Sequence, residues 1–241
     1  MIGLPREHAL TINDDRACPY LCPCPCPAPT SALPLNTLTA FATVAPASLL
    51  LLAAIVLASL IGLFIAPQFI DRNLFRPYFL VPRRQYATLV TSAFIHADLM
   101  HLLFNGFTLW AFAFKLERSI GTPRFAALYA VGLIVSDAGT WLNHRREPGY
   151  ATLGASGAIM AVLFASIIYF PGDSLFIMPI PVPIPAPLFA AGYLAYTWYA
   201  ARQQGGRINH DAHFAGALAG VAFVALTDPS AFGRALRQVL A

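Results

Sequence analysis

The stretch GYATLGASGAIMAVLFASIIYF, residues 149–170, is the most informative part of this chain. From Ala155 onward nearly every residue is apolar, as expected of a helix in a bilayer core about 30 Å thick. The apolar part nevertheless opens with Gly154-Ala155-Ser156-Gly157, which puts a hydroxyl group at the edge of a lipid-soluble helix. Polar groups inside a membrane are costly, and by default they suggest a function.

The composition of the whole chain also indicates a membrane protein. Of its 241 residues, 58% are hydrophobic and 11% are charged, whereas soluble domains have about 25% charged residues. A chain in lipid must satisfy its backbone polar groups internally, so we expect an all-α polytopic bundle. Six apolar runs are candidate spans, at residues 43–66, 99–114, 125–142, 155–170, 185–201 and 212–226.

These spans predict a membrane domain at residues 43–228, an N-terminal tail at 1–42 and a short C-terminal tail at 229–241. The N-terminal tail contains CPYLCPCPCPAP, which holds all four cysteines. We interpret it as a disordered Pro-rich segment, because polyproline II would point successive cysteines in different directions. A metal site is the alternative. We expect no signal peptide, since the first apolar run starts beyond residue 40 without a cleavage motif.

The charges leave the topology open. The net charge of +4 is scattered, so we expect no nucleic-acid partner. With a cytoplasmic N-terminus, seven of the 15 Lys and Arg residues would lie inside and eight outside, so the positive-inside rule does not fix the orientation.

Two loops have a distinctive composition. The fourth loop, PGDSLFIMPIPVPIPAP, repeats proline and cannot be helical throughout. The first loop, at 67–98, is aromatic and is expected to lie at headgroup level, through Phe69, Phe75, Tyr78, Phe79 and Tyr86.

Several polar side chains fall inside or at the ends of the expected spans, namely His101, Asn105, Asp137, Asn143, Ser156, His210, Asp211 and His213. His101 and Asn105 are four residues apart and share a helix face, whereas we expect His96 to lie in the loop or a cap and to point to another side. The second, fourth and sixth spans run in the same direction. His101, Ser156 and His213 are therefore expected at the same membrane depth. Asp137 lacks comparable partners, and we interpret it as structural.

Small residues follow both Ser156 and His213 at intervals of four, as Gly157, Ala161 and Ala165 on the fourth span and Gly216 and Gly220 on the sixth. Such faces let membrane helices approach closely. We therefore expect the fourth and sixth spans to be in direct contact, with the Ser156 hydroxyl within reach of the His213 imidazole.

This combination of residue types matches acyl-transfer chemistry. Serine is a weak nucleophile until an adjacent histidine takes its proton, and the developing oxyanion needs hydrogen-bond donors. Unpaired backbone N–H groups collect where a helix starts, and Asn105 and His101 can add side-chain N–H groups. Each residue alone would fit a packing or interface role. Their agreement in depth, face and chemistry favours a site.

Three blocks of the chain resemble the rhomboid family of intramembrane serine proteases, over about residues 85–228. HADLMHLLFN is similar to the family's second-span pattern, GASG to its GxSG motif and AHFAGALAG to its AHxxGxxxG block. The resemblance implies Ser156 as nucleophile, His213 as general base, and His101 and Asn105 as oxyanion donors. It also implies a six-transmembrane-helix bundle that cleaves transmembrane helices of substrate proteins without a metal or cofactor.

The resemblance further implies cytoplasmic termini and an active site open to the opposite side, in contact with membrane lipid. A fifth loop around Gly205-Gly206 would cap this site, and substrates would enter sideways past the fifth helix. We expect a multi-pass protein of a bacterial inner or plasma membrane.

The chain departs from the family pattern at two places. Ala87-Thr88 stands where many relatives have Trp-Arg, which affects the anchoring of the first loop. Met160 stands where many bacterial members have a tyrosine stacked on the base. A methionine can still contact the imidazole edge, so we expect altered positioning of His213 with retained chemistry.

Two other functions compete with proteolysis. A catalytically inactive rhomboid-like protein that binds membrane helices would share the fold, but such relatives typically lack the serine or the histidine. A metal or ion transporter would use His96, His101, His210 and His213. Zinc sites need about four convergent ligands, and we expect helical phase to separate His96 from His101.

Overall fold

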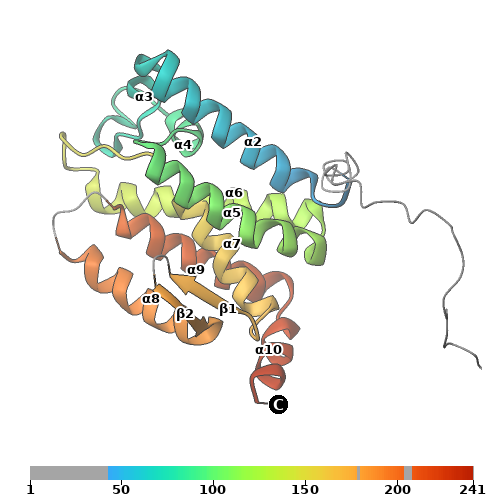
Figure 1. Ribbon diagram of the computed structural model, residues 1–241. Coiled ribbons are helices and arrows are strands. Elements are labelled where there is room, and N and C mark those ends of the chain that lie inside the picture. Colours follow the sequence, from blue (N-terminus) through green and yellow to red (C-terminus); the bar gives the residue numbers. More distant parts are fainter. Residues whose placement is uncertain (1–42, 178–179, 204–207, 241) are drawn as a thin grey trace, which may run out of the picture. The chain divides into compact units, whose positions relative to one another are not determined.

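The computed structural model describes residues 43–177, 180–203 and 208–240, so the Cys-rich tail and Gly205-Gly206 lie outside the described residues. The described chain is mostly helical, which confirms the expected fold class. Six longer helices follow the order of the predicted spans (Figure 1): α2 (Pro46–Leu60), α5 (Leu99–Ile120), α6 (Thr122–His144), α7 (Ser156–Tyr169), α8 (Ala186–Ala201) and α9 (His210–Thr227).

Short helices lie between α2 and α5 and after α9. The π-helical turn η1 (Ile61–Ile65) continues α2, and the first loop folds as α3 (Pro67–Asn73), η2 (Pro77–Phe79), α4 (Thr88–Thr91) and η3 (Ser92–Phe94). Part of the predicted C-terminal tail forms the helix α10 (Ser230–Leu240).

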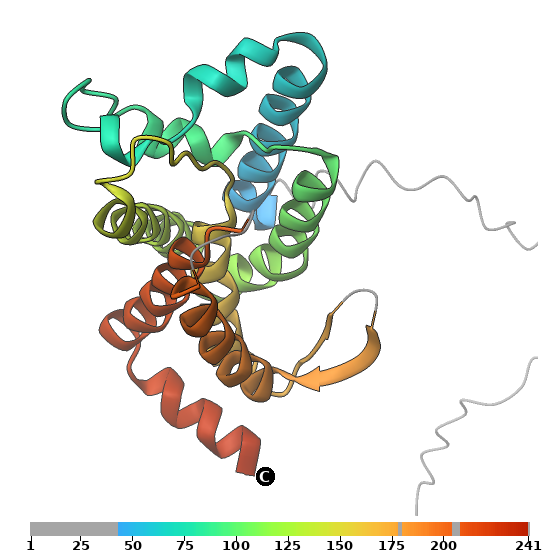
Figure 2. The ribbon, with the colours of Figure 1, turned by 90° about the vertical axis from the view of Figure 1, so that its left-hand side faces the viewer.

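The Pro-rich fourth loop forms an antiparallel hairpin of β1 (Ser174–Ile177) and β2 (Ile180–Pro185). Proline lacks the N–H that a helix needs, and residues before proline favour extended backbone, so this sequence takes a strand conformation. The hairpin is an addition to the all-α bundle that the sequence predicts. Figure 2 shows it extending away from the helices next to the start of α8.

Three of the helical segments are long and apolar enough to cross a membrane, namely α2 with η1, α5 and α6. In the described chain, α9 passes this test only together with α10, from which it is bent by 107°. The helix α7 has 14 residues, and Figure 2 shows it in the middle of the bundle, partly covered by α9. Every α7 residue from Gly157 through Ile167 is buried. The helix α7 is apolar on all its faces and therefore forms the core of the bundle.

A buried carboxylate joins the N-terminus of α2 to α5 and α6. Glu117 of α5 accepts hydrogen bonds from the backbone N–H groups of Ala47 (3.0 Å) and Ser48 (2.7 Å) and from the hydroxyls of Ser48 (2.6 Å) and Thr122 (2.7 Å). A negative charge at a helix N-terminus satisfies unpaired N–H groups and is favoured by the helix dipole. Glu117 therefore caps a helix other than its own.

The first loop packs on the segment that precedes α7. Phe75 is fully buried, and its N–H and C=O groups exchange two hydrogen bonds of 2.9 Å with Thr152. The expectation that Phe75 lies at headgroup level is therefore wrong, because its side chain is fully buried in the described chain. Phe69, Tyr78 and Tyr86 remain exposed, at 38%, 39% and 52%, as an interfacial position requires.

Candidate active site

The helices α7 and α9 touch backbone to backbone. A Cβ atom added to Gly216 would lie 2.0 Å from the carbonyl oxygen of Gly157, and one added to Gly220 would lie 2.3 Å from that of Ala161. Both distances are far shorter than van der Waals contact, so only glycine fits at these positions. The predicted direct contact of the fourth and sixth spans is confirmed.

This contact lies beside the two residues predicted as nucleophile and base. Ser156 is the first residue of α7, next to Gly157, and His213 lies in the first turn of α9, three residues before Gly216. The two helices run in the same direction, so both side chains belong to the same end of the bundle. The hydrogen bonds of the described residues include none between Ser156 and His213.

The loop that leads into Ser156 is fixed against the start of α5. Gly154 has a φ of +113°, which favours glycine, and its N–H donates to the carbonyl oxygen of Ser92 at 2.9 Å. A Cβ atom on Gly154 would lie 2.8 Å from Cε1 of His101. The His101 ring therefore packs directly on the loop that carries the serine, as the expected common depth requires.

Hydrogen-bond donors gather around the same loop. The helix α7 starts at Ser156, and within the described chain no side chain caps this end, so the backbone N–H groups of its first turn stay available. Asn105 is buried, and its Nδ2 donates to the carbonyl oxygen of His101 at 3.0 Å. An amide NH₂ has two donor hydrogens, which leaves Asn105 a second one.

The imidazole of His213 has a partner that the sequence did not predict. Nδ1 of His213 lies 2.9 Å from the hydroxyl of Tyr193 on α8, and the two rings are 24° from parallel with centroids 6.4 Å apart. Tyr193 precedes His213 by 20 residues on another helix, and no spacing rule links the two. The one hint in the sequence was Met160, because the resemblance places a tyrosine at this position in many bacterial members and a methionine leaves His213 without that aromatic neighbour.

An apolar cleft of about 950 Å³ leads from the side of the bundle toward this tyrosine. Residues of α5 and α8 line it, and so do Leu175 and Phe176 of the hairpin. Met160 and Leu163 of α7 line it as well. Its lining also includes Phe104, Phe107, Leu188, Tyr193 and Tyr196.

His96 lies beside His101, against the expectation that helical phase would separate them. The two rings meet edge to face with centroids 4.8 Å apart. His96 precedes the helix, as expected, but the chain turns at Asp98, whose carboxylate caps α5 by accepting from the N–H of His101 at 2.8 Å, so helical phase does not separate the two rings. Nδ1 of His96 lies 2.9 Å from the Ser59 hydroxyl. In the part of the chain that the structure describes, no three His, Cys, Asp or Glu side chains form a group suited to a metal ion.

Buried His96 predicts that stability falls on mild acidification. Burial, followed by the nearby His101, lowers the pKa of His96 from 6.5 to about 3, so the folded protein keeps this ring neutral. Its contribution to stability is complete above pH 6.5 and decreases as the pH falls from 6.5 toward 3. We expect the melting temperature in detergent to fall between pH 7 and pH 5, and to fall less steeply in His96→Asn. Equal slopes for the two proteins would contradict this assignment.

A polar cluster fixes α9 against the end of α6. His144 of α6 contacts Asp211 of α9 through Nε2 (2.9 Å) and Glu147 through Nδ1 (3.0 Å), and its ring stacks on Tyr150 at 3.7 Å. Asn143 donates to the same Asp211 carboxylate. Asp211 lies two residues before His213, so this cluster holds the first turn of α9, and with it the imidazole, at a fixed depth.

Comparisons with known proteins agree with this architecture. Residues 83–229 match the family model described as "Rhomboid domain". "Presenilin-associated rhomboid-like protein A, mitochondrial" of Danio rerio is 33% identical over 141 residues, which are 56% of this chain and 36% of that protein. "Putative rhomboid protease YdcA" of Bacillus subtilis (strain 168) is 37% identical over 82 residues, 34% of this chain and 40% of that protein.

"Rhomboid protein 1, mitochondrial" of Saccharomyces cerevisiae is 26% identical over 152 residues, 60% of this chain and 44% of that protein. The chain thus spans less than half the length of these three relatives. Since two of them are mitochondrial, they do not support the expected bacterial membrane. The membrane-spanning helices support an integral membrane protein.

Proposed function

Because the chain belongs to the rhomboid family, on the match of its residues 83–229, we propose that it is an intramembrane serine endopeptidase with Ser156 as nucleophile and His213 as general base. The observation that carries the proposal is the contact of Gly157 with Gly216, which brings the starts of α7 and α9 together. A serine and a histidine flank this contact at the same end of both helices. The sequence shows each of them, and the packing gives the reason for their proximity.

The proposed reaction uses groups that surround the start of α7. Nε2 of His213 takes the proton of the Ser156 hydroxyl as its oxygen attacks a peptide carbonyl. The backbone N–H groups of the first turn of α7, with Asn105 and His101, donate to the resulting oxyanion. His213 then returns the proton to the leaving amine, and water hydrolyses the acyl-enzyme by the same steps. The groups involved need no metal.

The apolar cleft between α5 and α8 suits the proposed substrates, which are transmembrane segments of other proteins. A segment arriving from the lipid would meet Phe104 and Phe107 on one wall and Leu188 on the other. Its backbone must then leave the helical conformation, because a helical peptide bond is shielded by its own hydrogen bonds. Small or helix-breaking residues near the cleavage point favour this step.

A serine-directed fluorophosphonate tests the dyad without a known substrate. We expect the purified protein in detergent to be labelled at Ser156. We expect His213→Ala to be labelled more slowly by a factor of about 100 or more, as for the loss of a general base. Peptide mass spectrometry locates the adduct. Labelling of His213→Ala at the unmodified rate would remove the role of the base. A folded protein that does not react at all would instead fit a rhomboid-like protein that binds membrane helices without cleaving them.

A further inference from the structure

The hydroxyl of Tyr193 occupies the one side of the His213 ring that the proposed reaction leaves unused. It lies 2.9 Å from Nδ1, whereas the reaction uses Nε2. Tyr193 is held in place by ring contacts with Phe189, at a centroid distance of 5.4 Å, and with Phe164, at 6.1 Å. The position of this hydroxyl is therefore fixed by packing from α7 and α8.

We propose that the Tyr193 hydroxyl oxygen accepts a hydrogen bond from Nδ1–H of His213 and so keeps the lone pair of Nε2 directed at Ser156. This inference rests on the proposed function. A neutral imidazole carries its proton on one nitrogen only, and the partner of that nitrogen decides which one. With the proton on Nδ1, Nε2 is free to accept the serine proton. With the proton on Nε2, the ring cannot act as a base toward Ser156.

The hydrogen bond also suits the protonated ring. After Nε2 has taken the serine proton, both ring nitrogens are donors, and the Tyr193 oxygen continues to accept from Nδ1–H. Tyr193 keeps its own proton throughout, so it acts as a positioning residue and not as a second base. Its role corresponds to the third group that orients the base in other serine hydrolases, with a phenol in place of a carboxylate.

The location of Tyr193 links this alignment to the cleft. Tyr193 lines the cleft between α5 and α8, and α8 carries large exposed side chains, including Leu188 at 65% and Tyr196 at 55%. A displacement of α8 would withdraw the hydroxyl from Nδ1. A transmembrane segment seated in the cleft therefore touches the same side chain that aligns the base.

The test compares Tyr193→Phe with Tyr199→Phe, which removes the same oxygen from the same helix. Tyr199 is 59% exposed and is not among the residues that line the cleft. Fluorophosphonate labelling of the full chain in detergent is measured from pH 5 to pH 9. We expect Tyr193→Phe to be labelled about tenfold more slowly, the equivalent of one lost hydrogen bond, and Tyr199→Phe to match the unmodified chain.

The pH profile separates alignment from a merely structural role. The protonated ring loses an acceptor in Tyr193→Phe, so the acidic limb of the rate profile should move to lower pH. The other titratable groups near His213, which are His210, His101 and Tyr196, are the same in all three proteins. The pH of the acidic limb depends only on the folded molecules that react with the probe. It can therefore be measured even if Tyr193→Phe is less stable than the unmodified chain.

Two results would overturn the inference. Unchanged labelling and profile in Tyr193→Phe would show that the hydroxyl does not align the base. Faster labelling of Tyr193→Phe, with its acidic limb moved to higher pH, would show that the Tyr193 hydroxyl donates to Nδ1 of His213 and favours the unreactive tautomer. A failure of the proposed function is a separate result, because the unmodified chain would then not be labelled either.

Discussion

Ser156→Ala is expected to abolish cleavage of a transmembrane reporter while leaving the protein folded. In the proposed mechanism the hydroxyl oxygen forms the acyl-enzyme, so its loss removes the covalent route, and in hydrolases of this type such a loss costs a factor of about 10⁶ in rate. Ser156 is only partly buried at the start of α7, and its side chain makes no hydrogen bond within the described residues. Alanine therefore fits the site without a stability cost. The measurement is gel-based cleavage in proteoliposomes.

A matched control for this variant is Ser166→Ala. Ser166 lies on the same helix, is 3% exposed and sits far along α7 from the reacting end. We expect Ser166→Ala to cleave the reporter and Ser156→Ala not to do so, with similar melting temperatures. Full cleavage by Ser156→Ala would reject the proposed nucleophile.

Gly216→Ala is expected to disable the site by separating α7 from α9. Its Cβ atom would lie 2.0 Å from the carbonyl oxygen of Gly157 and 2.8 Å from the carbonyl carbon. Backbone atoms cannot move aside as a flexible side chain can, so the helices must part near Ser156 and His213. Overpacking typically costs about 1–3 kcal/mol of stability, and a misplacement of about 1 Å can cost about 100-fold in rate. We expect both losses, measured by thermal melting and by labelling.

Gly192→Ala is the corresponding control for stability. Gly192 lies on α8, and a Cβ atom there would meet nothing within 4 Å among the described residues. Alanine is the better helix former by about 1 kcal/mol, so Gly192→Ala should melt no lower than the unmodified chain. A Gly216→Ala protein that melts and reacts like the unmodified chain would show that α7 and α9 are not in such close contact.

The sequence predicts those parts of the molecule that depend on local pattern. The six apolar runs correspond to the six longer helices, with ends that differ by up to six residues. The recurrence of Gly157 and Ala161 opposite Gly216 and Gly220 gave the packing of α7 on α9, because small side chains are what permits such contact. On that basis the sequence predicts that Ser156, His213 and His101 lie together.

The features that the sequence missed depend on contacts between distant segments. Tyr193 contacts His213 only because α8 packs with the face that carries Tyr193 toward α9. The sequence of an apolar helix does not indicate which of its faces points inward. Glu117 lies in the last turn of α5, where a charged residue is ordinarily exposed, and its capping of α2 requires the tertiary arrangement. His96 lies before α5 as expected, but its ring was expected to point away from His101, and the turn at Asp98 instead brings the two rings together.

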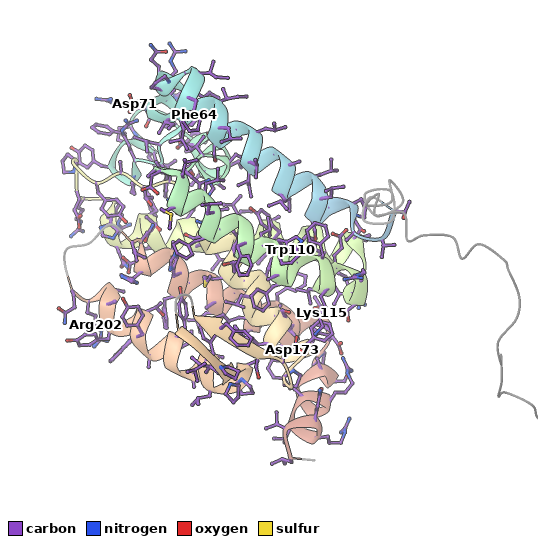
Figure 3. The ribbon with its side chains drawn as sticks, in the orientation of Figure 1. Phe64, Asp71, Trp110, Lys115, Asp173 and Arg202 are labelled. Carbon is purple, nitrogen blue, oxygen red and sulfur yellow. The ribbon has the colours of Figure 1, made fainter. Side chains whose placement is uncertain are left out.

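The shortness of α7 has a consequence for the supply of water. Its 14 residues span about 21 Å, against a hydrocarbon thickness of about 30 Å. The ion pair of Lys115 with Asp173, just beyond its C-terminal end, marks a charged boundary on one side (Figure 3). Ser156 then lies roughly 9 Å short of the opposite boundary, by the difference of these lengths. In the proposed reaction, the water that hydrolyses the acyl-enzyme would have to reach Ser156 from the aqueous phase, so access of water to this end of α7 would limit how fast the acyl-enzyme turns over.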